Sequence, residues 1–219
     1  MRRVFFAFFM LTLLTSLARA GSNAGGTLVL HALDLTYTTD GSVYCNQTPP
    51  RECEAINPTS SGAPLQVYTV LAVFSAGNKP RLRGVEFGVT YSGVLIDDWG
   101  SCAEVEDAMS GWPASGTGTV VTWSQSKTER IVPVYWFAGY LSSLAGAPTL
   151  ELTPHPVNGG HFGDDHVPTH LDGIAGYGLL GFGQTERTLP GSARIHAATG
   201  PHRRRADDSG RDLPRPPVA

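Results

Sequence analysis

Short stretches in which apolar and polar residues alternate, separated by turn-forming residues, constrain the fold of this chain more than any other feature. Within residues 84–92, GVEFGVTYS, every second position is apolar: Val85, Phe87, Val89 and Tyr91. Residues 149–153, TLELT, repeat the pattern with Leu150 and Leu152. A period of two is typical of a strand that buries one face and exposes the other. We therefore expect both leucines to point inward.

Further stretches rich in β-branched and aromatic residues also end at Gly, Pro, Asn or Ser: residues 27–38, 66–74, 119–124, 131–140 and 176–183. Residues 66–74, QVYTVLAVF, are apolar on both faces, as expected of a central strand. The chain contains 26 Gly and 16 Pro, which favours many turns over long helices. Only residues 103–110 predict a short helical turn. At least seven strands without a long helix predict an all-β fold, a single antiparallel β-sandwich domain.

The two ends of the chain differ from the body. Residues 1–20 combine Arg2 and Arg3 with an apolar stretch too short to span a bilayer, followed by Ala18-Arg19-Ala20. This order is typical of a secretory signal peptide; a retained N-terminal anchor is the alternative. Residues 191–219 are rich in Arg and Pro without apolar periodicity, and predict a disordered tail. The β-sandwich domain is thus expected over residues 21–190, with no membrane span after signal cleavage.

Charge argues against two classes of partner. Residues 21–190 carry 7 Lys and Arg against 16 Asp and Glu, a net charge of −9. An acidic body lacks the positive surface that binds nucleic acid or anionic lipid. The acidic body therefore predicts no nucleic-acid partner. The signal-peptide pattern of residues 1–20 predicts a secreted, extracellular or periplasmic location.

Export makes disulfides possible, and the chain has 3 Cys. Cys45 and Cys53 bracket a short loop of turn residues and are the favoured pair. Cys102 is then left over: it is buried, paired outside the chain, or the true partner of one of the others.

The stretch PHPVNGGHFGDDHVPTH holds the candidate metal ligands of this chain: His161, Asp164, Asp165, His166 and His170. His and carboxylate groups suit Zn²⁺, and carboxylates with carbonyl groups suit Ca²⁺. Pro168 lies between His166 and His170 and opposes the helix that would align them. The stretch also lacks the H-E-x-x-H pattern. A solvated turn-forming loop without a cofactor is the favoured interpretation, and a metal site is the alternative.

Aromatic residues offer a different kind of site. Trp99 and Trp112 lie in segments flanked by Gly or Pro, and we expect them to be exposed and to contact a ligand. Residues 131–140 are apolar on both faces, and core filling is favoured for them. Strict alternation would place Ile131, Tyr135 and Phe137 on one face and Val132, Val134 and Trp136 on the other.

The strand pair QVYTVLAVF and LRGVEFGVTYSGVLI resembles the start of a cohesin-type or carbohydrate-binding-type sandwich, over residues 27–100. The strings GWPASGTGTVVTW, VPVYWFAGY and GYGLLGFG are similar to secreted sandwich proteins of environmental bacteria. The resemblance implies a cohesin-like or jelly-roll-like sandwich that binds protein or glycan and carries no catalytic residues.

The sequence thus predicts a secreted non-catalytic module, not an enzyme. Its role would be structural, or the binding of a polysaccharide or surface protein at the cell surface or in the periplasm. The alternative is a metal-dependent hydrolase that uses the loop 155–172. No G-x-S-x-G nucleophile motif occurs in the chain.

Overall fold

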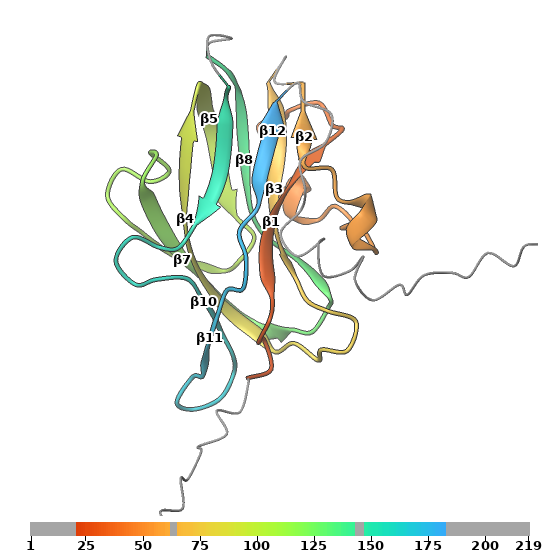
Figure 1. Cartoon of the computed structure of the whole chain (residues 1–219), viewed down its shortest axis with the longest axis vertical. Helices are drawn as coiled ribbons and strands as arrows, with labels where there is room; N and C mark the ends of the chain where they lie inside the picture. The colour runs from red at the N-terminus through yellow and green to blue at the C-terminus, as the bar shows by residue number, and fades with distance from the viewer. Residues whose placement is uncertain (1–20, 62–64, 143–146, 183–219) are drawn as a thin grey trace, which may run out of the picture.

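The computed structural model describes residues 21–61, 65–142 and 147–182, which form two β-sheets packed face to face (Figure 1). The strands are β1 (Thr27–Leu33), β2 (Thr59–Ser60), β3 (Gln66–Val73), β4 (Leu82–Ser92), β5 (Val94–Ser101), β6 (Val105–Ala108), β7 (Thr117–Lys127), β8 (Ile131–Leu141), β9 (Thr149–Thr153), β10 (His161–Gly163), β11 (Leu171–Gly173) and β12 (Leu179–Phe182). The helices are α1 (Ser42–Cys45) and the 3-10 helix η1 (Cys53–Ala55). The predicted all-β sandwich is confirmed.

The predicted signal peptide and the predicted tail lie outside the described residues. Within the three described ranges, no helix combines the length and the hydrophobicity needed to cross a bilayer.

The smaller sheet has the strand order β1-β3-β8-β5, with every neighbour antiparallel. The larger sheet has the order β11-β10-β4-β9-β12-β2, and β7 and β6 extend it from the opposite edge of β4. Strand β4 is therefore central. Its register pairs it with β7 on one side, and with β10 and then β9 on the other.

The core lies between the two sheets. Val85, Phe87 and Val89 of β4 are fully buried there, as the alternation in residues 84–92 predicts. Leu150 and Leu152 of β9 are buried in the same cluster, which confirms their inward orientation.

A β-bulge changes the faces of β8. Val70 of β3 pairs with Tyr135, whereas the next residue, Leu71, pairs with Pro133, so Val134 is an extra residue. An extra residue reverses the alternation beyond it. Four residues of β8 that strict alternation divides between two faces therefore all enter the main core: Val132, Val134, Tyr135 and Phe137. Core filling is confirmed for this strand, but the predicted division of its faces is wrong.

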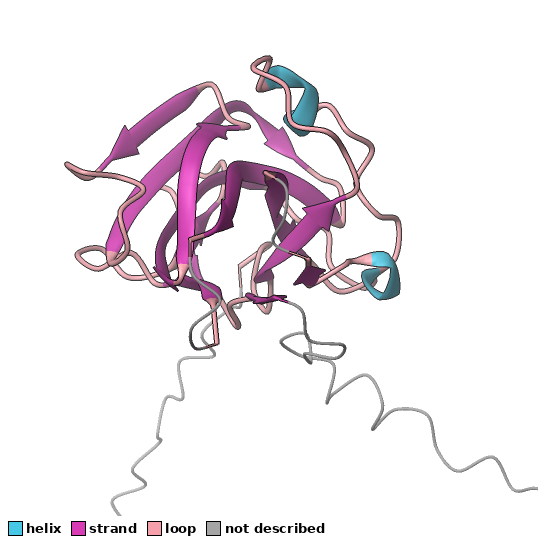
Figure 2. Cartoon of the chain, turned by 90° about the horizontal axis from the view of Figure 1, so that it is seen from above, coloured by secondary structure: helices cyan, strands magenta, loops and turns pink. Residues whose placement is uncertain are grey.

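The connection from β1 to β3 covers the outer face of the smaller sheet. We call its described part, residues 34–61, the strap. Tyr44 of α1 packs on Trp136 of β8 with ring centroids 4.9 Å apart, and Ile56 packs against Leu71 and other residues of the sheet's outer face. Figure 2 shows both short helices outside the strands. Because the strap buries the outer face of β3, this strand is apolar on both sides.

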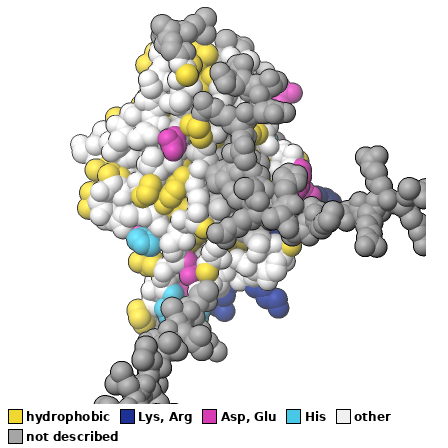
Figure 3. Space-filling view, in the orientation of Figure 1, with side chains coloured by type: hydrophobic (Ala, Val, Ile, Leu, Met, Phe, Trp, Pro, Cys, Tyr) yellow, Lys and Arg dark blue, Asp and Glu magenta, His cyan; other side chains and the backbone are white. Residues whose placement is uncertain are grey.

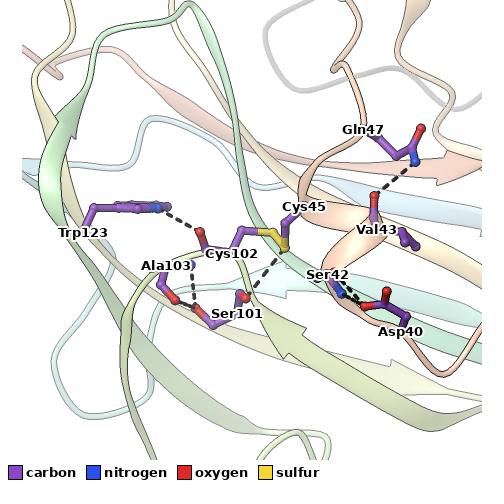
Figure 4. Close-up of a disulfide and its surroundings, with 9 residues drawn as sticks. All are labelled: Asp40, Ser42, Val43, Cys45, Gln47, Ser101, Cys102, Ala103 and Trp123. Atoms are coloured by element: carbon purple, nitrogen blue, oxygen red, sulfur yellow. Dashed lines mark hydrogen bonds between the residues drawn. A yellow bond between two sulfur atoms is a disulfide. The ribbon is translucent and has the colours of Figure 1, made fainter.

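A disulfide joins the strap to the end of β5, between Cys45 and Cys102 (Figure 4). The predicted Cys45–Cys53 pair is wrong, and Cys53 is a free, partly buried thiol. The two cysteines belong to different clusters on the outer face: Cys45 packs with the Tyr44 group and Cys53 with the Ile56 group. Closeness in sequence was therefore misleading.

The predicted helical turn over residues 103–110 is also wrong. Residues Val105–Ala108 form β6, which pairs with Thr119–Thr122 of β7. The Thr119 hydroxyl donates a hydrogen bond of 2.8 Å to Oε1 of Glu106. All four residues of β6 are exposed. Their sequence, VEDA, is too short and too polar to show the apolar periodicity by which a strand is predicted.

Candidate functional site

The histidine-rich stretch folds as two short strands and the turn between them. Strand β10 pairs with β4 and with β11, at the edge of the larger sheet. The connecting residues 164–170 form no helix. Figure 3 shows histidine side chains toward the lower end of the molecule, the end at which Figure 1 labels β10 and β11.

Three of the five predicted metal ligands come together in this turn. Asp164, His166 and His170 each offer a ligand atom, and these atoms lie within 4.8 Å of one another. Oδ2 of Asp164 is 2.5 Å from Nδ1 of His166 and 3.4 Å from Nδ1 of His170. The two imidazole rings stack with centroids 4.6 Å apart.

Asp164 organises the turn. Its Oδ1 accepts hydrogen bonds from the backbone N–H groups of His166 and His170, at 3.1 and 2.9 Å. Burial by itself would raise the pKa of this carboxyl group, but the hydrogen bonds from His170 and His166 outweigh it and lower the pKa. Asp164 is therefore a carboxylate, held in one orientation at neutral pH.

The other two predicted ligands have different partners. Nδ1 of His161 lies 2.9 Å from Oε2 of Glu86 on β4. Oδ2 of Asp165 accepts hydrogen bonds from the Arg81 guanidinium and the Ser126 hydroxyl, both at 2.7 Å. The Arg81 contact, followed by the Ser126 contact, lowers the pKa of Asp165 to about 2. Both residues thus fasten the β10–β11 region to its neighbours within the larger sheet, His161 to β4 and Asp165 to Ser126 of β7.

A groove of about 380 Å³ adjoins the turn on the outer face of the larger sheet. Arg83, Glu86 and Trp123 line it, together with Asp164 and His166. Nε of Arg83 donates a hydrogen bond of 3.1 Å to the Trp123 carbonyl, which fixes the guanidinium along the groove. The groove therefore brings together the Arg83 guanidinium and the buried Asp164 carboxylate.

A second candidate surface is the free edge of the smaller sheet, formed by β5, and it includes Trp99. Trp99 is 40% exposed and Leu95 is 48% exposed. Leu95 pairs with Tyr140 of β8, so these two side chains lie next to each other on one face. A bulge at Asp97 then reverses the alternation, and Trp99 pairs with Phe137 of the core. We call Leu95, Trp99 and Tyr140 the β5 edge surface.

Trp112 does not contribute to any exposed surface. It is only 9% exposed and lies in the main core, with its ring centroid 5.6 Å from that of Tyr135. Its Nε1–H donates a hydrogen bond of 2.7 Å to the Tyr135 hydroxyl. The prediction that Trp112 is exposed is wrong, because the turn 109–116 folds its ring inward between the sheets.

Two residues of the β5 edge surface, Leu95 and Tyr140, could not be identified from the sequence. Leu95 stands between Val94 and Ile96 in a continuous apolar run, so nothing in the sequence marks it as exposed. Tyr140 lies at the end of a strand that is otherwise buried. Only the register of β5 against β8 shows that these residues meet.

Searches against known proteins give structural neighbours only. No family model matches the chain, and no curated protein sequence matches it. A cohesin module from a family 33 glycoside hydrolase of Clostridium perfringens aligns with a TM-score of 0.46 and 9% identity, over 73% of this chain and 97% of that one.

Two further cohesins align less well. A type I cohesin from Pseudobacteroides cellulosolvens gives a TM-score of 0.41 and 8% identity, over 59% of this chain and 89% of that one. A non-cellulosomal cohesin from Archaeoglobus fulgidus gives 0.36 and 7%, over 81% of this chain and 100% of that one. The chain thus has a weak resemblance to cohesin modules, the family that its strand pair at residues 66–96 resembles.

Proposed function

We propose that this chain is an exported, non-catalytic module that binds a protein partner through the β5 edge surface. The observation that carries the proposal is the exposure of Leu95 and Trp99 on an edge strand. Elsewhere in the smaller sheet, large apolar side chains are covered by the larger sheet or by the strap. Aromatic and aliphatic side chains grouped at an exposed edge are typical of a protein interface.

The shape of the surface favours a protein over a polysaccharide. The bulge at Asp97 separates Leu95 and Tyr140 on one face from Trp99, which pairs with a residue of the other face. Stacking against sugars needs aromatic rings that present a common platform. A polypeptide that lies along the strand can contact both faces and also pair with the open edge of β5. The edge therefore matches an extended protein segment better than a sugar chain.

Export is supported by two features of the chain. Residues 1–20 have the pattern of a secretory signal peptide. The Cys45–Cys102 disulfide is compatible with an oxidising compartment, where such bonds persist.

The test is photocrosslinking from the full-length chain followed by titration. A photoreactive residue at position 95 is expected to crosslink a protein, and the purified partner is then titrated against variants. Leu95→Ala and Trp99→Ala are expected to weaken binding by about tenfold or more each. Val157→Ala is the matched control, because Val157 is an exposed apolar residue outside the β5 edge surface.

Two outcomes would contradict the proposal. Equal loss of affinity in the Val157 control would show that the β5 edge surface is not the contact. Binding of a polysaccharide that depends on Trp99 and not on Leu95 would replace the protein partner with a glycan.

A metal-dependent hydrolase is the second candidate, since the turn 164–170 gathers three ligands, one Asp and two His, of the types that such enzymes use. Hydrolysis also needs a free base beside the metal-bound water. The other described carboxylates lining the groove are Glu86, which faces His161, and Asp165, which is paired with Arg81. Their engagement is the reason that we rank the hydrolase below the binding module.

A further inference from the structure

We propose that Asp164, His166 and His170 bind one divalent transition-metal ion, with Zn²⁺ as the best match. This inference does not depend on the β5 edge surface. It narrows the five ligand candidates of the sequence to three, and it gives the metal a place on the turn between β10 and β11.

The carboxylate is already positioned for a metal. The Asp164 side chain is 0% exposed, and its Oδ1 is engaged by two backbone N–H groups of the same turn. Oδ2 is left facing the two imidazoles. A ligand whose second oxygen is held by hydrogen bonds loses little freedom when it binds a metal, and outer-sphere contacts of this kind raise metal affinity.

The separations between the ligand atoms are close to those of a tetrahedral site. With Zn–N and Zn–O bonds near 2.1 Å, tetrahedral ligands lie about 3.4 Å apart. Oδ2 of Asp164 is 3.4 Å from Nδ1 of His170. The corresponding distance to His166 is 2.5 Å, a direct hydrogen bond, so this ring must withdraw by about 1 Å to admit the ion.

That movement is available to the side chains concerned. His166 and His170 are 49% and 60% exposed, so neither ring is fixed by packing on all sides. In the hydrogen-bonded arrangement Nδ1 of His166 carries the hydrogen that faces the carboxylate. This nitrogen would bind a metal once the hydrogen has moved to Nε2 of the same ring or to solvent. The metal would then take the place of a hydrogen without opening the fold.

The donor set indicates which metal. Two imidazoles and one carboxylate suit Zn²⁺ and neighbouring transition metals, whereas Ca²⁺ requires six or more oxygen ligands. Three protein ligands leave one coordination position for water. Asp164 and His166 both line the groove, so that water would be accessible from it.

Zn²⁺ titration of the full-length, chelator-treated chain by calorimetry tests the site. We expect one Zn²⁺ per chain, and we expect His166→Ala and His170→Ala each to weaken binding by at least about tenfold. Both variants should keep the circular dichroism spectrum of the original chain, because the two rings are largely exposed. Substituted Co²⁺ should give the strong visible absorption of a tetrahedral site, and each His variant should lose it.

His161→Ala is the matched control: it removes a histidine from the same stretch, but one that faces Glu86. Its Zn²⁺ affinity should equal that of the original chain. The proposal is overturned if the chain binds no Zn²⁺, or if His161→Ala weakens binding as much as His166→Ala and His170→Ala do.

Discussion

Trp112 and Trp99 show how one residue type has two opposite roles in this protein. Trp112 packs edge-on to Phe87 and Tyr135 between the sheets and donates its N–H to the Tyr135 hydroxyl. Burial raises the pKa of Tyr135, so its hydroxyl stays protonated and acts as the acceptor. Trp99, on the free edge, is 40% exposed to solvent.

Replacing these two residues by Ala should therefore have very different effects on stability. Trp112→Ala leaves a cavity and removes the donor to Tyr135, and should lower the free energy of unfolding by about 3–5 kcal/mol. Trp99→Ala should lower it by less than about 1 kcal/mol. Urea unfolding of both variants measures this. Equal losses would mean that Trp99 also belongs to the core.

At the scale of the elements, the strap decides what the smaller sheet exposes. It lies between two strands that pair directly, yet it spans the outer face of that sheet and buries Val67 and Trp136 beneath Tyr44. Cys102, at the other end of the disulfide, is also tied to the sheet. Its backbone N–H donates to the Val134 carbonyl at 3.0 Å. Its carbonyl accepts a hydrogen bond of 3.0 Å from Nε1 of Trp123 (Figure 4).

The disulfide should consequently stabilise the chain by restricting its unfolded state. It closes a loop with a sequence separation of 57 residues. The variant Cys45→Ser/Cys102→Ser should lower the free energy of unfolding by roughly 2–4 kcal/mol. Cys53→Ser is the control and should change it little. A loss of the same size in Cys53→Ser, or a Cys45–Cys53 peptide in a non-reducing digest, would contradict the observed pairing.

At the scale of the whole molecule, one core connects both sheets. Tyr68 of the smaller sheet and Phe87 and Leu150 of the larger sheet belong to the same buried cluster. Because both sheets bury their inner faces in this one cluster, neither should be stable once its partner is removed.

Unfolding of the oxidised chain should accordingly be a single transition. Tryptophan fluorescence and far-ultraviolet circular dichroism should give the same midpoint in urea, with a β-type spectrum before the transition. Two separate midpoints would show that the sheets unfold independently. That result would contradict the single-domain interpretation.

Sequence alone was sufficient for most strands and for the fold class. The alternation in residues 84–92 and 149–153 places β4 and β9 with their inward faces correct, because a period of two leaves one arrangement that buries the apolar residues. Strands β5, β10 and β11 were not predicted. They are short or exposed along much of their length, so hydrophobic periodicity does not reveal them.

The candidate sites were predicted in part. The stretch 161–170 contains the three residues that meet, but composition could not separate them from His161 and Asp165. That separation depends on neighbours distant in sequence: Glu86, Arg81 and Ser126 lie 75, 84 and 39 residues from their partners.

The sequence by itself determined that this protein is built from strands and which faces of its most regular strands are buried, because both follow from local periodicity. The tertiary structure decided the partner of Cys45, the burial of Trp112 and the meeting of Leu95 with Tyr140. Each of these depends on bulges and on a strap that fold segments distant in the chain against one another, and such contacts leave no mark on local patterning.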